Sequence, residues 1–368
     1  MRYDYLIVGA GFAGSVLAER LASQAGKRIL LIDRRTHIAG NAYDEINADG
    51  ILIHRSGPHI FHTNDSRVYE YLSAFTAWRQ YEYRVLSSVN GMLVPIPVNR
   101  TTVNMLCGTE FRSGTEVEEY FARTREGSTH VTNSEEYVVS RIGRRLYELI
   151  YAGYTKKQWG IPARELAPSV CGRIPIRTNL DDRYFDDRFQ GIPEAGYTEL
   201  FRRILDHPNI ELRLGTEFRQ AAEETFNTLI YTGQIDEYFS FVHGRLPYRS
   251  LRFAYDTWDR EFVQTVATIH YPNEHPYTRT TEYKHLTGQR HAKTTVAKEF
   301  PCADGEPYYP IPNRESELLY EKYRAESAKL RSVRFLGRLG SYRYYNMDQV
   351  IAQSLIAFEQ LQKNQNPV

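Results

Sequence analysis

The pattern of apolar and polar positions near the start of the chain predicts a strand, a tight turn and a helix. Residues Tyr5–Val8 form an apolar, β-prone run, a G-x-G-x-x-G string follows, and residues 15–22 show the apolar spacing of a helix. A second β-prone run, Arg28–Asp33, ends in a carboxylate 24 residues after Gly9. Because an acid at that position of a β-α-β unit faces a ribose hydroxyl, the pattern favours a dinucleotide site over a unit that serves packing alone.

The three glycines of this string each have a physical reason to be glycine. Gly9 allows a turn that a β-carbon would prevent, Gly11 lets the backbone approach a pyrophosphate, and Gly14 permits close contact between helix and strand. The unpaired N–H groups at the start of the helix would then face the phosphates.

The later hydrophobic pattern predicts two further structural units and a second strand-turn-helix. Residues 116–154 have helical spacing, residues 251–300 read as an antiparallel sheet, and an amphipathic helix begins near Met347 after a strand and a glycine-containing turn. A second helix N-terminus at the end of the chain would close over a cofactor larger than a nicotinamide dinucleotide. Flavin dinucleotide folds have this arrangement.

We therefore expect an α/β protein that combines an FAD-binding Rossmann-like domain, an inserted helical subdomain and an antiparallel β-sheet domain. The sequence shows no internal repeat, low-complexity tract or long linker, so the domains should interleave along the chain. The expected ranges are 1–75, about 190–240 and 325–368 for the FAD-binding domain, about 105–170 for the helical subdomain, and about 76–104, 171–190 and 245–325 for the sheet domain.

Composition narrows the class of partner. Lysine and arginine (46) nearly cancel aspartate and glutamate (45), which argues against nucleic acid or an anionic membrane as partner. No apolar run approaches the roughly 18 residues of a membrane helix, so no membrane insertion is expected. Cys107, Cys171 and Cys302 have neither disulfide nor metal-ligand spacing, so we expect no metal and a reducing, cytoplasmic location.

Aromatic and histidine content points to candidate chemistry. The chain has 28 tyrosines, whose rings can stack on a base or sugar while the hydroxyl hydrogen-bonds a phosphate, although many will serve packing. The string "SGPHIFHTND" contains His59 and His62, each of which taken alone is more readily a buried structural residue than a functional one.

Several longer strings resemble the bacterial UDP-galactopyranose mutases, nearly from end to end. The specific ones are "GYTKKQWG", "GRIPIR", "PYTRTTEYKH", "EPYYPI" and "GRLGSYRYYNMDQV", in this order. The resemblance implies a reduced-FAD-dependent isomerase that interconverts pyranose and furanose forms of UDP-galactose through a flavin–sugar covalent intermediate, with NADPH or another reductant for activation. It also implies a homodimer and a role in cell-surface polysaccharide biosynthesis.

The resemblance assigns site residues by position in these strings. Arg173 and Arg279 match arginines that bind the diphosphate, where a planar guanidinium suits the charge better than an ammonium. His59 matches a residue that tunes the flavin, and the catalytic set is completed by Tyr344 and Asn346. The remaining substrate contacts are Tyr154, Thr155, Trp159, Tyr184, His270 and Tyr309. The implied cofactor contacts are Gly9, Gly11, Ala13, Gly14, Asp33, Asn41, His59, Ile60, Arg338, Tyr345, Met347, Asp348, Gln349 and Val350.

Three departures from the family pattern lie near the expected substrate. Asn346 stands where the family has an acid, His270 where it has an asparagine, and residues 176–182 replace an aromatic residue by polar ones. Neutral drift would keep UDP-galactopyranose as the substrate, whereas a functional change would make the chain a sister flavoenzyme for a nucleotide sugar with another base or sugar.

Two interpretations from other classes stay open on the sequence. A flavin oxidoreductase would share the N-terminal glycines but have no use for two arginines and a tyrosine cluster aimed at a diphosphate. A non-catalytic nucleotide-sugar binding protein would not need flavin.

Overall fold

The N-terminal glycine string follows the central strand of a parallel five-stranded sheet, at the carboxyl end of that strand. The computed structural model describes residues 2–127, 130–221 and 223–365. The sheet has the strand order β10-β2-β1-β11-β17, and every pair in it is parallel. Its strands are β1 (Arg2–Val8), β2 (Ile29–Asp33), β10 (Ile210–Leu214), β11 (Thr225–Tyr231) and β17 (Val333–Phe335). All five residues of β2 are buried, as an inner strand of a covered parallel sheet requires.

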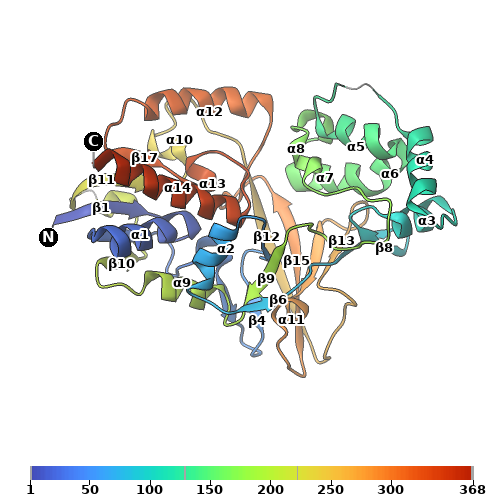
Figure 1. Ribbon diagram of the computed structural model, residues 1–368, viewed down its shortest axis with the longest axis horizontal. Coiled ribbons are helices and arrows are strands. Elements are labelled where there is room, and N and C mark those ends of the chain that lie inside the picture. Colours follow the sequence, from blue (N-terminus) through green and yellow to red (C-terminus); the bar gives the residue numbers. More distant parts are fainter. Residues whose placement is uncertain (1, 128–129, 222, 366–368) are drawn as a thin grey trace.

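Helices from both ends of the chain cover this sheet. Helix α1 (Phe12–Ala25) packs against α14 (Met347–Gln365) and α9 (Tyr197–Leu205), and α12 (Arg314–Ser327) lies on the far side of α14 in Figure 1. The helix predicted near residues 15–22 is thus longer at both ends. The helix predicted from Met347 begins at that residue.

The geometry of the glycines agrees with their expected reasons. Gly9 has φ +105, and a β-carbon there would lie 2.1 Å from Thr232 Oγ1. A β-carbon on Gly14 would lie 2.0 Å from the Gly9 carbonyl oxygen, so helix and turn can touch only without it. A β-carbon on Gly11 would meet only the Gly40 Cα, at 3.7 Å. Gly11 is therefore the one of the three that faces open space.

A second, seven-stranded sheet lies beside the first unit (Figure 1), with the order β16-β12-β15-β14-β13-β7-β8. Its pairs are antiparallel, as predicted, except that β13 runs parallel to β7. Two strands within residues 85–96 belong to this sheet, in addition to the strands predicted for residues 251–300. The strands are β7 (Val85–Val89), β8 (Met92–Ile96), β12 (Tyr248–Trp258), β13 (Thr268–His270), β14 (Arg279–Glu282), β15 (Thr294–Cys302) and β16 (Tyr309–Pro310).

The helical part is a cluster at the opposite end of the molecule from the parallel sheet (Figure 1). Its first helix, α3, starts at Arg100, ahead of the stretch 116–154 whose spacing predicted helices. Its members are α3 (Arg100–Cys107), α4 (Gly114–Thr124), α5 (Ser134–Ile142), α6 (Arg144–Leu146), the π-helix η2 (Tyr147–Ala152), α7 (Gly153–Trp159) and α8 (Ser169–Gly172). Asn99, Ser113 and Asn133 cap α3, α4 and α5 through their side chains.

Two small sheets and several short helices join these units. The pair β3 (Asp44–Ile46) and β4 (Leu52–His54) precedes the "SGPHIFHTND" string, and β5 (Phe61–Thr63) lies within it. Strand β5 pairs with β9 (Phe189–Pro193), which also pairs with β6 (Trp78–Gln80). The short helices are α2 (Ser66–Ser73), α10 (Ile235–Tyr238), α11 (Tyr283–Thr287), α13 (Gly337–Gly340), η1 (Gly40–Ala42), η3 (Ala163–Glu165) and η4 (Phe218–Ala221). The three-domain boundaries drawn from the sequence stay a prediction.

No helix in the described ranges is long and apolar enough to cross a membrane. Within the same ranges, no group of histidine, cysteine and acidic side chains has the arrangement of a metal site. The three cysteines are free thiols.

Candidate active site

Two cavities meet where the parallel sheet, the seven-stranded sheet and the helical cluster come together. The smaller, of about 700 Å³, lies at the carboxyl ends of β1, β2 and β11. The larger is a cleft of about 1170 Å³ between the helical cluster and the seven-stranded sheet. His59, Arg338 and Met347 line both. A ligand in the smaller cavity can therefore reach a ligand in the cleft.

The smaller cavity has the features of a dinucleotide site. Gly9, Gly11, Ala13, Asn41 and Val350 line it, whereas Gly14 lies behind, against the Gly9 carbonyl. Helix α1 begins at Phe12 with no side-chain cap, so its first N–H groups are free to meet an anion.

Asp33 lies at the end of β2 on the wall of this cavity. Its carboxylate accepts hydrogen bonds from the backbone N–H of Ala10 (2.8 Å) and Arg35 (2.9 Å). Beside it, Arg35 donates to Asn41 Oδ1 (2.9 Å), and Glu306 pairs with Arg34 (2.5 Å). The acid thus orders the glycine turn at the wall of the cavity.

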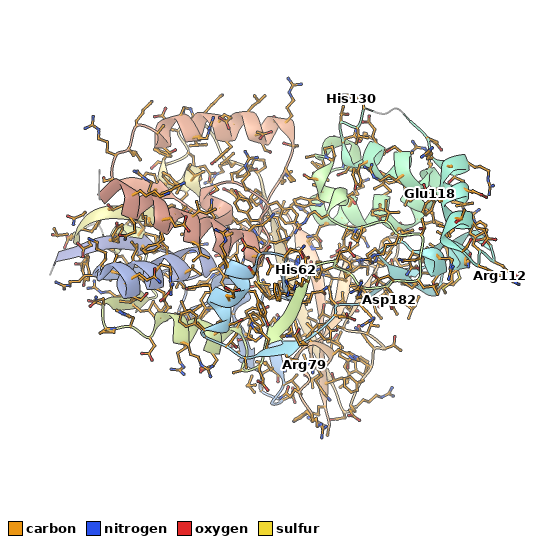
Figure 2. All side chains as sticks on the ribbon, in the orientation of Figure 1. His62, Arg79, Arg112, Glu118, His130 and Asp182 are labelled. Atoms are coloured by element: carbon orange, nitrogen blue, oxygen red, sulfur yellow. The ribbon has the colours of Figure 1, made fainter. Side chains whose placement is uncertain are left out.

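His59 stands at the junction of the two cavities, in the loop after β4. Its Nδ1 lies 2.8 Å from the carbonyl oxygen of Gly57, and its backbone N–H donates to Nδ1 of the buried His54 (3.1 Å). Burial, with the neighbouring His54 and arginines, lowers the pKa of His59 to about 3, and burial lowers that of His54 to about 4. His59 is therefore neutral near pH 7, with Nδ1–H bound to the loop. The other histidine of the "SGPHIFHTND" string, His62 of β5, lies near the middle of the molecule in Figure 2. Its Nδ1 lies 2.7 Å from Asp187 Oδ2, and its ring stacks on Phe185 at the cleft wall.

The remaining predicted cofactor residues lie just before β5 and around the start of α14. Ile60, Tyr345 and Gln349 line the cleft, and Met347 lines both cavities. Asp348 lines neither cavity, and its carboxylate accepts a hydrogen bond from Thr63 Oγ1 (3.1 Å). The Asp348 side chain thus joins β5 to α14.

Arg279 lies on the sheet side of the cleft and is held by a buried acid. Its Nε and Nη2 donate to Glu299 Oε2 at 2.8 and 2.7 Å across the β14–β15 pair. Glu299 is 2% exposed, and its Oε1 has no hydrogen-bond partner among the described residues. Because one charge balances the other, the guanidinium can stand in an enclosed cleft with its Nη1 edge free of Glu299.

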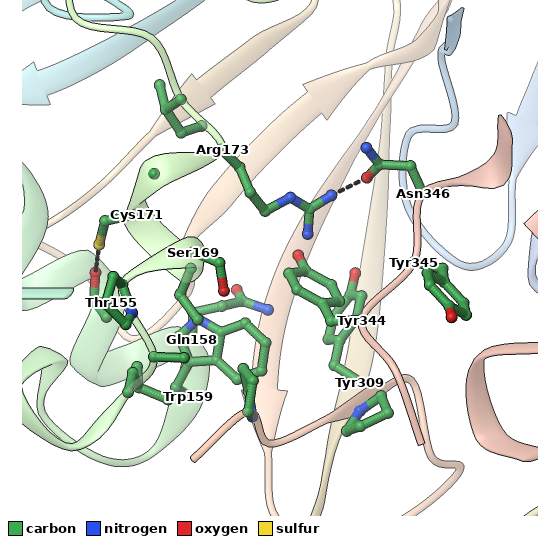
Figure 3. A pocket seen from close by; sticks show the side chains of 18 of the residues that line it. Thr155, Gln158, Trp159, Ser169, Cys171, Arg173, Tyr309, Tyr344, Tyr345 and Asn346 are labelled. Carbon is green, nitrogen blue, oxygen red and sulfur yellow. Dashed lines mark hydrogen bonds between the residues drawn. The ribbon is translucent and has the colours of Figure 1, made fainter. Parts of the chain in front are cut away.

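Arg173 reaches the cleft from the opposite side, just after α8. Its Nη2 donates to Asn346 Oδ1, and its guanidinium carbon lies 3.9 Å from the centre of the Tyr344 ring (Figure 3). The Asn346 backbone N–H donates to Gln349 Oε1 (2.9 Å). Asn346 therefore joins the helical cluster to the first turn of α14.

An aromatic cluster fills the space between these two arginines. The rings of Trp159 and Tyr309 lie at 5.1 and 5.3 Å from that of Tyr344, both nearly perpendicular to it. The half-buried Arg338 lies over Tyr309 (5.3 Å) and is fixed by the carbonyls of Tyr345 (2.7 Å) and Tyr308 (3.1 Å). Figure 3 shows Tyr345 pointing away from this cluster. The rings of Trp159, Tyr309 and Tyr344 thus lie beside Arg173 and Arg338, across the cleft from Arg279.

Helix α7 carries Tyr154, Thr155 and Trp159 and is anchored to the sheet by two cations. Lys157 Nζ donates to four carbonyls of the β13–β14 loop, those of Tyr271, Glu274, His275 and Tyr277. Arg249 of β12 donates to the carbonyls of Gln158 (3.0 Å) and Lys157 (3.2 Å) at the C-terminus of the helix. The π-helix η2 leads directly into α7, and such π-helical turns are frequent at functional sites.

At the far end of the cleft, His270 stacks on Tyr154. The two ring centres are 4.6 Å apart with an interplanar angle of 26°, and Tyr184 meets His270 edge-on at 6.2 Å. Thr155 is buried nearby, with its hydroxyl 3.8 Å from Cys171 Sγ. Every substrate residue named from the sequence therefore lines the cleft.

Sequence reasoning missed several residues that shape the site. Glu299 holds Arg279, Lys157 and Arg249 hold α7, and Ser87 lines the cleft with a buried, unpartnered hydroxyl. Lys157 lies inside "GYTKKQWG", which marks it as part of the motif. The other three come from strands remote in sequence, so only pairing of the strands identifies them.

Comparisons with known proteins agree with the predicted family and fold. A family model described as UDP-galactopyranose mutase matches residues 149–344, and one described as NAD(P)-binding Rossmann-like domain matches residues 7–75. Among solved structures, reduced UDP-galactopyranose mutase has a TM-score of 0.81 at 16% identity, covering 99% of this chain and 94% of that one.

Two relatives are similar over nearly their whole length. A probable UDP-galactopyranose mutase of Klebsiella pneumoniae is 39% identical over 362 residues, which cover 96% of this chain and 93% of the relative. A dTDP-fucopyranose mutase of Escherichia coli is 35% identical over 363 residues, covering 95% and 96%. The predicted resemblance is therefore confirmed: the chain belongs to the UDP-galactopyranose mutase family and is an isomerase with a Rossmann-like dinucleotide-binding domain.

Proposed function

We propose that this protein binds FAD and, with the flavin reduced, interconverts the pyranose and furanose forms of UDP-galactose. The observation that carries the proposal is the meeting of the two cavities at His59, Arg338 and Met347, with two further arginines in the cleft. The cytoplasmic location, the homodimer and activation by NADPH or another reductant belong to the same proposal.

The residues of the smaller cavity fit a flavin dinucleotide. Gly11 leaves open the space that a side chain would fill, and the uncapped start of α1 offers N–H groups to a pyrophosphate. The first turn of α14 would supply a second helix N-terminus at the junction, where the flavin ring would lie beside the neutral His59. When bound and reduced, the flavin would supply the nucleophile for the anomeric carbon of the sugar.

The cleft residues would bind and release the diphosphate. Arg279 and Arg173 approach it from opposite walls, so the charge that develops on the leaving diphosphate meets two guanidinium groups and the tyrosine hydroxyls of Tyr309 and Tyr344. This stabilisation does not require a general acid. The rings of Trp159 and the tyrosines would exclude water, which otherwise competes for the anomeric carbon.

The first prediction concerns the reaction itself. Protein reduced with dithionite should convert UDP-galactopyranose into its furanose isomer, as followed by NMR, whereas oxidised protein in anaerobic buffer without reductant should not. In the same assay, dTDP-fucopyranose tests the activity that the name of the Escherichia coli relative describes. CDP- and GDP-sugars test whether the enzyme accepts other bases. Consumption of NADPH or oxygen in proportion to product would instead identify an oxidoreductase.

The second prediction concerns the cofactor. Gly11→Val should remove the yellow flavin absorbance while the protein stays folded, because the new side chain enters the open space next to Gly40 rather than the protein core. Ser23→Val, on an exposed position of the same helix, should keep the flavin. Full flavin content in the Gly11 variant would show that the pyrophosphate does not lie at this turn.

The third prediction concerns Arg279. Lysine keeps the positive charge but cannot hold Glu299 and a phosphate with separate edges of one planar group. Arg279→Lys should therefore lower kcat/KM by roughly 10- to 100-fold, which corresponds to the loss of about one charge-assisted hydrogen bond. Arg252→Lys, on an exposed position of β12, should leave kcat/KM unchanged. An unaltered rate in the Arg279 variant would remove this residue from the site.

The fourth prediction concerns Asn346. A carboxylate at this position would accept a charge-assisted hydrogen bond from Arg173 and would suit the N-terminus of α14, so Asn346→Asp should raise turnover of UDP-galactopyranose by roughly two- to tenfold. Asn346→Ala, which removes the acceptor, should lower it. If the unmodified enzyme turns over UDP-galactopyranose rapidly and Asn346→Asp lowers that rate, the amide of Asn346 contacts the substrate instead.

A further inference from the structure

A row of polar side chains crosses the seven-stranded sheet beneath the cleft. The strand register places Ser87 of β7 opposite His270 of β13, His270 opposite Arg279 of β14, and Arg279 opposite Glu299 of β15. Residues in register on neighbouring strands project from the same face. At a strand spacing of roughly 4.8 Å, the row spans about 14 Å, which is on the scale of an extended nucleotide diphosphate.

The two ends of the row face different parts of the cleft. Glu299 lies close to the Gly57 turn that carries His59, so this end is near the junction of the two cavities. Ser87, at the other end, lies among Ile96, Ile150 and Tyr151, which line the far end of the cleft. With the ligand of the proposed function, the row therefore runs from the reacting sugar, at the Glu299 end, toward the nucleoside, at the Ser87 end.

Like the Ser87 hydroxyl at the end of the row, the His270 ring has no hydrogen-bond partner among the described residues. The His270 side chain is 7% exposed. Burial, together with the Arg279 guanidinium, lowers the pKa of His270 to about 3. The imidazole is therefore neutral near pH 7 and presents one N–H donor and one nitrogen acceptor to the cleft.

We propose that His270 hydrogen-bonds the ribose of the nucleotide and thereby makes the enzyme prefer a ribonucleotide sugar over its 2′-deoxy counterpart. The inference rests on the proposed function, because it takes the diphosphate to lie at Arg279. One strand step separates His270 from Arg279, and the Tyr154 ring, which would carry the base, lies against His270. The group between a diphosphate and a base is the ribose.

The chemistry of a neutral imidazole suits a hydroxyl better than a phosphate. A phosphate oxygen adjacent to Arg279 gains most from the guanidinium, whereas the 2′-hydroxyl of a ribose can both donate and accept and so can bond whichever ring nitrogen faces it. A 2′-deoxyribose would leave that nitrogen of the buried His270 ring without a partner. That loss would act against dTDP-linked sugars independently of the 5-methyl group on the base.

The test compares UDP, dUDP and dTDP as ligands of the oxidised, FAD-loaded protein by isothermal titration calorimetry. UDP and dUDP differ only at the 2′-hydroxyl, and dUDP and dTDP only at the 5-methyl group. The unmodified protein should bind UDP roughly 10-fold or more tightly than dUDP. His270→Phe, which keeps a ring against Tyr154 but has no ring nitrogen, should weaken UDP binding until the two affinities are within about twofold, with dUDP little affected.

His275→Phe serves as the matched control. His275 is an exposed residue of the β13–β14 loop whose ring stacks on Tyr277 at 4.7 Å, and it lines neither cavity. This variant should keep the full UDP preference. Flavin absorbance and thermal unfolding of each variant report whether it is folded.

Two results would overturn the inference. Equal binding of UDP and dUDP by the unmodified protein would do so without any variant, and so would a preference that persists in His270→Phe. Failure of the unmodified protein to bind UDP at all is a different result, because it would contradict the proposed function as well.

Discussion

The buried ion pair between Arg279 and Glu299 is the contact on which the cleft depends. A diphosphate can leave water only if fixed positive charge replaces its hydration, and a guanidinium in an enclosed cleft needs its own compensation before the ligand arrives. Glu299, 2% exposed on the neighbouring strand, provides it at 2.7 Å. Loss of Arg279 would leave the Glu299 carboxylate buried and unpaired, which typically costs about 3–5 kcal/mol. In the proposed function, the sheet register that aligns β14 with β15 is therefore also a requirement of diphosphate binding.

The helical cluster shares a hydrophobic core with this sheet, and two cations fix α7 against it. Lys157 inserts its ammonium among the carbonyls of the β13–β14 loop, and Arg249 binds the last carbonyls of α7. Both cations bind backbone oxygens, so they fix the position of α7 without depending on the side chains of the loop. The Tyr154 and Trp159 rings are thereby held over the strands that carry His270 and Arg279.

The opposite wall of the cleft belongs to the start of α14, which lies next to the dinucleotide cavity. Asn346 accepts a hydrogen bond from Arg173 of the helical cluster, while Asp348, two residues further along the chain, binds Thr63 of β5. A single helix start thus connects three units of the fold at the junction of the two cavities. The histidines at the same junction are neutral because burial disfavours their charged forms, so the positive charge there comes from arginines alone.

The sequence by itself determined the local units: the glycine turn of β1 and α1, the acid that ends β2, the helix from Met347, and the motifs that identify the family. Each of these depends on spacing within a few residues, where backbone geometry and hydrophobic periodicity leave little choice. Only the tertiary structure decided which remote residues meet. Glu299 beside Arg279, Ser87 beside His270, the parallel β7–β13 pair inside an otherwise antiparallel sheet, and the turn of Asp348 away from both cavities all follow from strand register and packing. Residues separated by 20 to nearly 300 positions meet there through chain-wide contacts that no local pattern encodes.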